Sequence, residues 1–295
     1  MDLSDFAAEV GDAGPVTITG LGTRGGAVDG IRCVAAPTGI EWIQADEMIV
    51  SCGAGTPVAE LDTALAEVRQ SVALALTGTV GGALSVGLSG IRRLGDGPVR
   101  DVLLQTHYVS AAGEVVKAGG PTVKNVSGFD LCRLLVGSRG TLGFLGDVIL
   151  RTRPVPDASQ WFRCEGEPWA VFATLYRPVS VLWDGESTWA LLEGHPLDVA
   201  EQAALVGMHA VDGPPQLPTG GRWSLAPGEL RSLAERSTAG RFVAEIGVGV
   251  VHHQTPAPQR TLQPPIAALH RRLKQELDPA DRLNPGISKG AVAGV

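Results

Sequence analysis

The sequence predicts an α+β fold in two halves that meet near residue 155. In the first half, apolar residues recur at helical spacing from Thr56 to Arg69, which predicts an amphipathic helix. Two apolar segments, Asp101–Val109 and Val115–Ala118, flank the turn AAGE and predict a β-hairpin. The composition changes after Pro156, because five of the six tryptophans lie beyond that residue. Helices and strands without a regular βα alternation indicate the α+β class.

Shorter elements complete both halves. We expect further helices at residues 4–10, 81–88, 130–136, 197–208 and 265–277. Strands are expected at residues 16–19, 31–35, 48–52, 71–76, 142–151 and 241–251. In the helix that follows Thr56, this residue is the expected N-cap and Pro57 the first helical residue.

The bulk composition bounds the function. A chain of 295 residues has room for two domains of ordinary size. A formal net charge of −7 argues against nucleic-acid binding, which needs a basic surface. The four cysteines are widely spaced and form no C-x-x-C pair, so we expect no metal site, no disulfide framework and a reduced, cytoplasmic compartment. The first residues, MDLSDFAAEV, lack the features of a signal peptide.

One uncharged segment, Gln70–Ile91, is long enough to span a bilayer. It nevertheless holds five glycines and five Ser or Thr residues, and the turn-like sequence TGTVGG interrupts it. Membrane-spanning helices are predominantly apolar, so we expect no transmembrane segment.

The first candidate binding motif is the glycine-rich segment GLGTRGG, residues 20–26, which directly follows a predicted strand. Consecutive glycines let backbone N–H groups approach an anion closely, and Thr23 and Arg24 add a hydroxyl and a cation. The alternative is a plain glycine turn. The segment is no Rossmann fingerprint, because no helix follows in the required register, and no P-loop lysine motif occurs.

Two further glycine segments follow. Residues 77–82 (TGTVGG) and 87–90 (GLSG) bracket a short apolar helix and could let a flat ligand lie against the backbone. The alternative is a tightly packed buried turn. In the third segment, Lys124–Gly143, glycines recur at every third residue near its end. There Asp130 is the expected N-cap of a helix, and Lys124 reads as a solvated surface charge.

Residues 124–150, KNVSGFDLCRLLVGSRGTLGFLGDVIL, resemble the signature of the PCMH-type, vanillyl-alcohol-oxidase-like FAD-binding domain. More narrowly, they resemble the FAD-binding subunits of glycolate oxidase. The segments GAGTPVAELDTALAE, GTVGGALSVGLSG and PVRDVLL resemble the same family in the same order. The resemblance runs from about residue 4 to 156 and returns at LDPADRLNPGI, residues 277–287.

The resemblance implies the domain organisation. Residues 1–155 would form a two-subdomain PCMH-type FAD-binding domain, and residues 156–276 a shortened α+β cap or substrate domain. Residues 277–295 would return to the FAD domain, with Asn284 and Pro285 folding back towards it. In this family a strand and a longer helix precede the strand that enters the first glycine loop. Met1 is only fifteen residues from Val16, so either the true start lies upstream of Met1 or an edge element has been lost. We expect the chain alone to be marginally stable, poorly soluble or dependent on a partner subunit.

The resemblance also implies which residues bind FAD. The pyrophosphate would lie on the first loop, at Gly20, Leu21, Gly22, Thr23 and Arg24. The pyrophosphate and flavin side would be lined by Thr79, Gly81, Gly82, Ser85 and Ser89. The adenosine or dinucleotide edge would meet Gly140, Thr141 and Gly143. No flavin-linking histidine is evident, so non-covalent FAD is expected. The family often has glycine where Leu21 stands, which implies a differently shaped turn, because leucine disfavours positive φ.

The chain is thereby expected to be an FAD-dependent oxidoreductase subunit for a small 2-hydroxy acid. Its implied partners are a second flavoprotein subunit and an iron–sulfur subunit, which would also account for any association with the membrane. No catalytic residue is assigned, because the H-x-G-D-G-N-x-H type motif of the sister catalytic subunits is absent. The nearest candidate is GVGVVHH, where His252 and His253 read as a pair at a strand end, or alternatively as a catalytic base. A non-catalytic FAD-binding or structural subunit and a stand-alone flavin oxidase for another alcohol are the other hypotheses.

Overall fold

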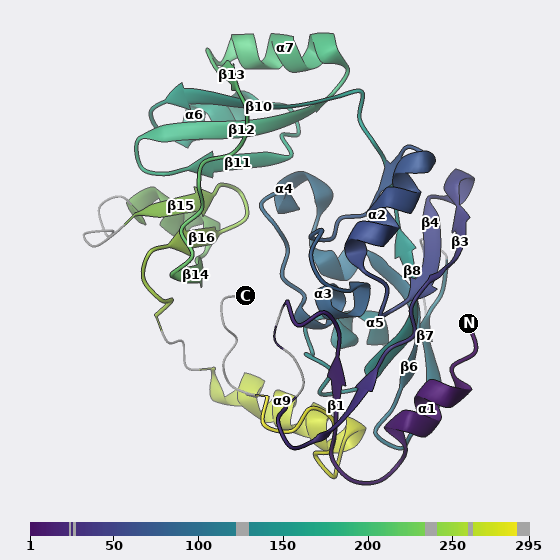
Figure 1. Ribbon diagram of the computed structural model, residues 1–295. Coiled ribbons are helices and arrows are strands. Elements are labelled where there is room, and N and C mark those ends of the chain that lie inside the picture. The colour runs from purple at the N-terminus through teal and green to yellow at the C-terminus, as the bar shows by residue number, and fades with distance from the viewer. Residues whose placement is uncertain (24, 26–27, 122–129, 234–240, 259–261, 288–295) are drawn as a thin grey trace. The chain divides into compact units, whose positions relative to one another are not determined.

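The computed structural model describes residues 1–23, 25, 28–121, 130–233, 241–258 and 262–287. It divides into two compact units, which are described separately (Figure 1). Of the described residues, unit 1 holds those in 1–89, 98–155 and 262–287, and unit 2 holds those in 90–97 and 156–258. The chain passes from unit 1 to unit 2 after Val155. The helix at residues 264–277, however, lies in unit 1 rather than with residues 156–276.

Unit 1 is built on a five-stranded antiparallel sheet with the order β3-β4-β8-β6-β7. Its strands are β3 (Ile40–Gln44), β4 (Ile49–Gly53), β8 (Phe144–Arg151), β6 (Leu103–Val109) and β7 (Val115–Gly119). Strand β8 is central and is buried along its length except at Arg151, because both faces of the sheet are covered. The edge strand β3 was not expected from the sequence.

Helices cover the two faces of this sheet with different partners. On one face, α2 (Val58–Glu67), α3 (Val80–Val86) and α5 (Leu131–Leu135) contribute apolar side chains to the core that also contains Val148 and Leu150 of β8. A smaller core joins α1 (Ser4–Val10) to the parallel pair β1 (Val16–Thr19) and β2 (Arg32–Ala35). This pair leads the chain into the first glycine segment.

Two local expectations for unit 1 are wrong. Thr56 is not the N-cap of α2: its hydroxyl accepts a hydrogen bond from the backbone N–H of Gly39 and donates one to the Gly39 carbonyl. Pro57 takes the N-cap position, and the helix begins at Val58. The strand expected at residues 71–76 is reduced to β5 (Gln70–Ser71), which pairs with β9 (Arg153–Pro154). The chain beyond β5 turns instead of continuing a ladder.

Unit 2 is a seven-stranded antiparallel sheet with the order β13-β10-β12-β11-β15-β16-β14. The strands are β10 (Ala158–Glu165), β11 (Ser180–Trp183), β12 (Ser187–Gly194), β13 (His209–Val211), β14 (Gly221–Ser224), β15 (Phe242–Glu245) and β16 (Val250–His253). Helices α6 (Pro168–Thr174) and α7 (Pro196–Leu205) pack into its core, and α4 (Arg93–Asp96) belongs to the same unit. The single strand expected at 241–251 is two strands, because Gly247 and Gly249 take positive φ and reverse the chain.

The C-terminal part of unit 1 fixes the entrance to β1. After helix α9 (Pro264–Leu277), Leu283 pairs with Val16 in a parallel bridge. The buried guanidinium of Arg282 donates hydrogen bonds to five carbonyl oxygens, those of Val10, Gly11, Ala13, Gly14 and Ala111. The C-terminal segment therefore lies against the residues that lead into β1. Across the described residues, no helix has the length and apolar character needed to cross a membrane.

Candidate functional site

A cavity of about 610 Å³ opens in unit 1 where β1, α3 and the C-terminal segment meet. This volume is typical of sites for cofactors and other small ligands. The residues that line it are Ile18, Thr19, Gly20, Leu21, Gly22, Thr23, Gly25, Ala36, Ala54, Gly55, Thr79, Gly81, Gly82, Ser85, Val86, Leu88, Arg139, Phe144, Leu145, Asn284 and Ile287.

The first glycine segment forms one wall of the cavity. Strand β1 ends at Thr19, and the next four residues all line the cavity. Positive φ falls on Gly22 (69°) and Gly25 (98°), not on Leu21, whose side chain is 60% exposed. The turn therefore accommodates leucine by placing the left-handed conformation on the glycines that follow. Arg24 lies outside the described residues.

The second glycine segment forms the facing wall, where Thr79, Gly81, Gly82 and Ser85 all line the cavity. Gly81 approaches the neighbouring backbone so closely that its N–H donates to the Ala54 carbonyl over 2.6 Å. A Cβ atom at Gly81 would lie 2.9 Å from that oxygen, so only glycine fits. The Thr79 hydroxyl caps α3 by accepting a hydrogen bond from the N–H of Gly82 over 3.1 Å.

Four of the expected site residues do not line the cavity. Ser89 accepts a hydrogen bond from the N–H of Val99. A Cβ at Gly143 would lie 2.5 Å from the Tyr108 ring, and one at Gly140 would lie 2.6 Å from the Asn284 amide nitrogen. The carbonyl of Thr141 accepts a hydrogen bond from Lys274 over 2.7 Å. Gly140 and Gly143 thus permit close packing within unit 1.

Arg139 and Asn284 are among the cavity residues that were not assigned to the site from the sequence. Arg139 is the one charged residue among the described lining residues, and it has a positive φ of 55°. Its backbone N–H donates to the Ser85 carbonyl over 2.8 Å. Asn284 ties three segments together, because its side chain accepts from Thr17 and Ile18 and donates to the Arg139 carbonyl. Arg139 stands inside the motif GSRG, so a cation between glycines was the available signal.

The chemistry of this lining fits a dinucleotide such as FAD. Glycine backbone, threonine and serine hydroxyls and the Arg139 guanidinium can donate to a pyrophosphate. Apolar side chains, including Val86, Leu88 and Phe144, can cover flat rings. FAD fits both kinds of lining residue, because its negatively charged pyrophosphate lies between two flat ring systems.

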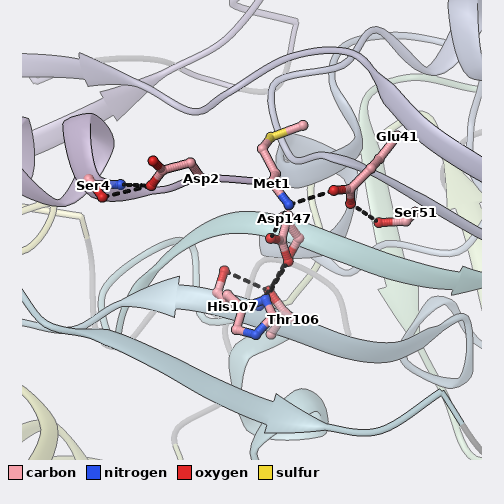
Figure 2. A network of polar contacts seen from close by, with 8 residues as sticks. All are labelled: Met1, Asp2, Ser4, Glu41, Ser51, Thr106, His107 and Asp147. Carbon is pink, nitrogen blue, oxygen red and sulfur yellow. Dashed lines mark hydrogen bonds and ion pairs between the residues drawn. The ribbon is translucent and has the colours of Figure 1, made fainter.

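A separate polar cluster lies on the sheet of unit 1 and has no member on the cavity wall (Figure 2). The His107 ring nitrogen Nδ1 is 2.8 Å from Asp147 Oδ1, across strands β6 and β8. On β3, Glu41 accepts hydrogen bonds from the Met1 amino group over 2.6 Å and from the Ser51 hydroxyl over 2.9 Å. These two bonds, the first above all, lower the pKa of Glu41. The cluster joins four strands of the sheet.

The adjacent histidines His252 and His253 of β16 have different surroundings. The His253 ring stacks on Trp223 with centroids 4.0 Å apart, and its Nδ1 accepts from the N–H of Thr255. Burial lowers the pKa of His253. His252 Nε2 instead lies 2.8 Å from Oε1 of the buried Glu245. Among the described residues, no group of three or more His, Cys, Asp or Glu side chains is arranged to hold a metal ion.

Comparisons with known proteins relate this chain to FAD-binding proteins. Residues 8–119 match the sequence model of the FAD binding domain family. The chain is 29% identical to glycolate oxidase subunit GlcE of Escherichia coli (strain K12), over 94% of this chain and 93% of that one. It is 36% identical to a D-lactate dehydrogenase of Archaeoglobus fulgidus, over 46% of this chain and 32% of the relative.

A solved structure of alkyldihydroxyacetonephosphate synthase has the same fold, with a TM-score of 0.66 and 15% sequence identity. The likeness covers 96% of this chain and 72% of that structure. The predicted α+β class and the PCMH-type resemblance are both confirmed by these findings. The chain therefore carries an FAD-binding domain of the PCMH type and is an FAD-binding oxidoreductase.

Proposed function

We propose that this chain is the FAD-binding subunit of a glycolate oxidase-type complex that oxidises a small 2-hydroxy acid to the 2-oxo acid. The likeness to GlcE over almost the full length of both chains carries the proposal. A second match supports it: glycolate oxidase subunit GlcD of Bacillus subtilis is 38% identical over 28% of this chain. The proposed partners are a second flavoprotein subunit and an iron–sulfur subunit, and the proposed location is cytoplasmic.

The cavity of unit 1 is the proposed site of non-covalent FAD. The bound flavin would supply a two-electron hydride acceptor. The backbone of residues 20–23 and 25, with the Thr23 hydroxyl and the Arg139 guanidinium, would hold the pyrophosphate through charge-assisted hydrogen bonds. Thr79, Gly81, Gly82 and Ser85 would line the opposite side, while Gly140 and Gly143 shape the wall by their packing. No histidine, cysteine or tyrosine is among the described lining residues, so no attachment point for a covalent flavin is found there.

A non-catalytic role as a binding subunit is a second candidate. It is favoured by one observation: the described cavity wall contains no His, Asp, Glu, Lys or Tyr side chain that could act as a general acid or base. A stand-alone flavin oxidase for another alcohol is the third hypothesis, and it requires turnover by the isolated chain.

An anaerobic titration separates these hypotheses. Glycolate and D-lactate are added to the FAD-loaded chain, first alone and then with its co-expressed partner subunits, and bleaching of the flavin absorption band is followed. Bleaching that appears only with the partners supports the complex. Turnover by the chain alone supports the stand-alone oxidase. An assembled complex that contains FAD in this subunit but shows no bleaching with either acid contradicts the proposal.

The cofactor site has its own test. Arg139→Met should weaken FAD binding about tenfold, because one charge-assisted hydrogen bond to the pyrophosphate is lost. The exposed Arg133→Met is the matched control. FAD affinity is measured by the recovery of flavin fluorescence on dilution, and acid precipitation shows whether the flavin stays with the protein. Equal affinities in the two variants would remove Arg139 from the site.

A further inference from the structure

The end of α9 carries a buried ion pair outside the cavity wall. Lys274 and Asp278 are 8% and 1% exposed, and the Lys274 ammonium group donates a hydrogen bond to Asp278 Oδ2. The same ammonium group lies 3.2 Å from a carboxylate oxygen of Asp281. Neither Lys274 nor Asp278 is among the described residues that line the cavity. Burying two opposite charges is costly unless further hydrogen bonds complete both groups, so the partners of the pair indicate its role.

Both members of the pair bind backbone groups that lead to the cavity. Lys274 Nζ donates to the carbonyl of Thr141 over 2.7 Å and to that of Leu283 over 3.4 Å. Asp278 accepts from the N–H of Arg282 over 3.0 Å and from that of Leu283 over 2.8 Å. Lys274 and Asp278 thus form a clamp between the third glycine segment and the C-terminal segment, which lies beside β1 (Figure 1).

Asn284 follows Leu283 directly and connects the clamp to the cavity wall. Its side-chain oxygen accepts hydrogen bonds from the Thr17 hydroxyl over 2.8 Å and from the N–H of Ile18 over 3.1 Å. Its amide nitrogen donates to the Arg139 carbonyl over 2.7 Å. Because Ile18, Arg139 and Asn284 all line the cavity, a shift of Asn284 would displace the wall at each of these places.

Two of these wall residues hold a backbone conformation that most side chains disfavour. Arg139 has a φ of 55° and Asn284 a φ of 47°. This left-handed conformation costs free energy outside glycine, and it persists at ligand-binding sites where the surrounding contacts impose it. At Arg139 these contacts are the hydrogen bond from its N–H to the Ser85 carbonyl and the one that its carbonyl accepts from Asn284. Lys274 holds the same turn two residues further on, at Thr141.

We propose that Lys274 and Asp278 are positioning residues for the cofactor cavity. They fix the C-terminal segment, and Asn284 passes this position on to the turn at Arg139. The Arg139 guanidinium is thereby held where the pyrophosphate of FAD binds. The inference rests on the proposed FAD site and deepens it, because it assigns a role in cofactor binding to residues that do not touch the cofactor. A pair that only stabilised unit 1 would leave the FAD affinity of the folded chain unchanged.

The test is a double-mutant cycle between Lys274 and Arg139, measured as the dissociation constant of FAD from the full-length chain. Lys274→Met should weaken FAD binding about tenfold, the effect expected of Arg139→Met itself. If Lys274 acts through Arg139, the double variant should also bind FAD only about tenfold more weakly than the unaltered chain, because coupled residues are not additive. Independent effects would multiply to about a hundredfold.

Two controls separate positioning from stability. Leu65→Ala removes a buried side chain of α2 and should lower the melting temperature, yet the folded chain should keep its FAD affinity. The exposed Arg272→Met of α9 should change neither. Lys274→Met leaves the Asp278 carboxylate buried without its cationic partner, so circular dichroism checks folding. If this variant does not fold, Lys274→Met combined with Asp278→Asn takes its place in the cycle, because no unpaired charge is then buried.

The outcomes distinguish the clamp from the cofactor site. Binding about tenfold weaker, both with the clamp variant alone and with Arg139→Met added, supports the clamp. Unchanged FAD affinity in the folded clamp variant, or a loss of about a hundredfold when Arg139→Met is added, overturns the clamp and leaves the cofactor site in place. If Arg139→Met alone binds FAD as the unaltered chain does, the proposed cofactor site fails and the clamp fails with it. These measurements use no 2-hydroxy acid, so they are independent of the proposed reaction.

Discussion

The first and third glycine segments of unit 1 look alike in the sequence, yet Gly22 of the first and Gly143 of the third have different surroundings. At Gly22 an added Cβ meets no atom within 4 Å, and the residue lines the cavity. At Gly143 an added Cβ would lie 2.5 Å from Tyr108, and the residue does not line the cavity. A glycine-rich motif therefore indicates that a side chain is excluded, but not whether a ligand or the protein itself excludes it.

Close packing within unit 1 also depends on Arg282, and its substitution should cause the largest loss of stability. Arg282→Met removes this donor from five carbonyl oxygens, four at or just after the end of α1 and one in the turn between β6 and β7. Buried acceptors without partners are costly, so the free energy of unfolding of unit 1 should fall by about 4 kcal/mol. The exposed Arg271→Met of α9 should change it by less than about 0.5 kcal/mol. Urea unfolding measures both, and equal midpoints would contradict this role.

The elements of unit 1 were largely predictable, whereas its long-range contacts were not. The spacing of Val58, Leu61 and Leu65 in α2 and the AAGE hairpin are local patterns with strong periodic signals. Arg282 and Asn284 act through residues about 270 positions earlier in the chain, and no local pattern encodes such a pairing. The missed strands β10 to β14 belong to unit 2, where the resemblance offered no guide.

The same limit applies to the candidate site. The glycines and hydroxyls of the first two segments could be named from their motif, since such a motif is contiguous in the chain. The sequence alone could not identify Arg139 as a site residue, because its place on the cavity wall depends on its positive φ and on the hydrogen bond from its N–H to the Ser85 carbonyl. The pairing of Glu245 with His252 depended on where β15 ends and β16 begins, and the sequence predicted one continuous strand there.

Gly143→Ala tests the packing role of the third segment. Its Cβ would overlap the Tyr108 ring, and overpacking of a tight core costs about 1–3 kcal/mol. The chain should therefore lose stability in thermal unfolding, while the folded fraction keeps its FAD affinity. An unchanged melting temperature together with weakened FAD binding would show that Gly143 makes room for the cofactor rather than for the Tyr108 ring.

Gly22→Ala is the reciprocal test. The left-handed φ of 69° costs an alanine about 1–2 kcal/mol, a smaller loss than that of Arg282→Met. An added methyl group at this part of the cavity wall meets no protein atom within 4 Å, so it would occupy space proposed for FAD. We therefore expect FAD affinity to fall about tenfold as well, an effect of about 1.4 kcal/mol. Gly14→Ala is the matched control: Gly14 has the same φ of 69°, also meets no atom, and does not line the cavity. Equal FAD affinity in the two variants would show that the first segment lies away from the cofactor.

The smallest expected effect separates the two adjacent histidines of unit 2. Burial lowers the pKa of His253 in the folded chain below its ordinary value of 6.5. The unfolded chain therefore binds the proton more tightly, so stability should be complete above pH 6.5 and decline as the pH falls from there towards the folded pKa. The slope for one group cannot exceed about 1.4 kcal/mol per pH unit. His253→Phe keeps an aromatic ring against Trp223 and should remove this slope from the urea unfolding of unit 2, whereas the exposed His209→Phe should keep it. If the slope persists in His253→Phe, the buried ring is not the titrating group. The different surroundings of the two faces of β16 would then have no effect on how the free energy of unfolding depends on pH.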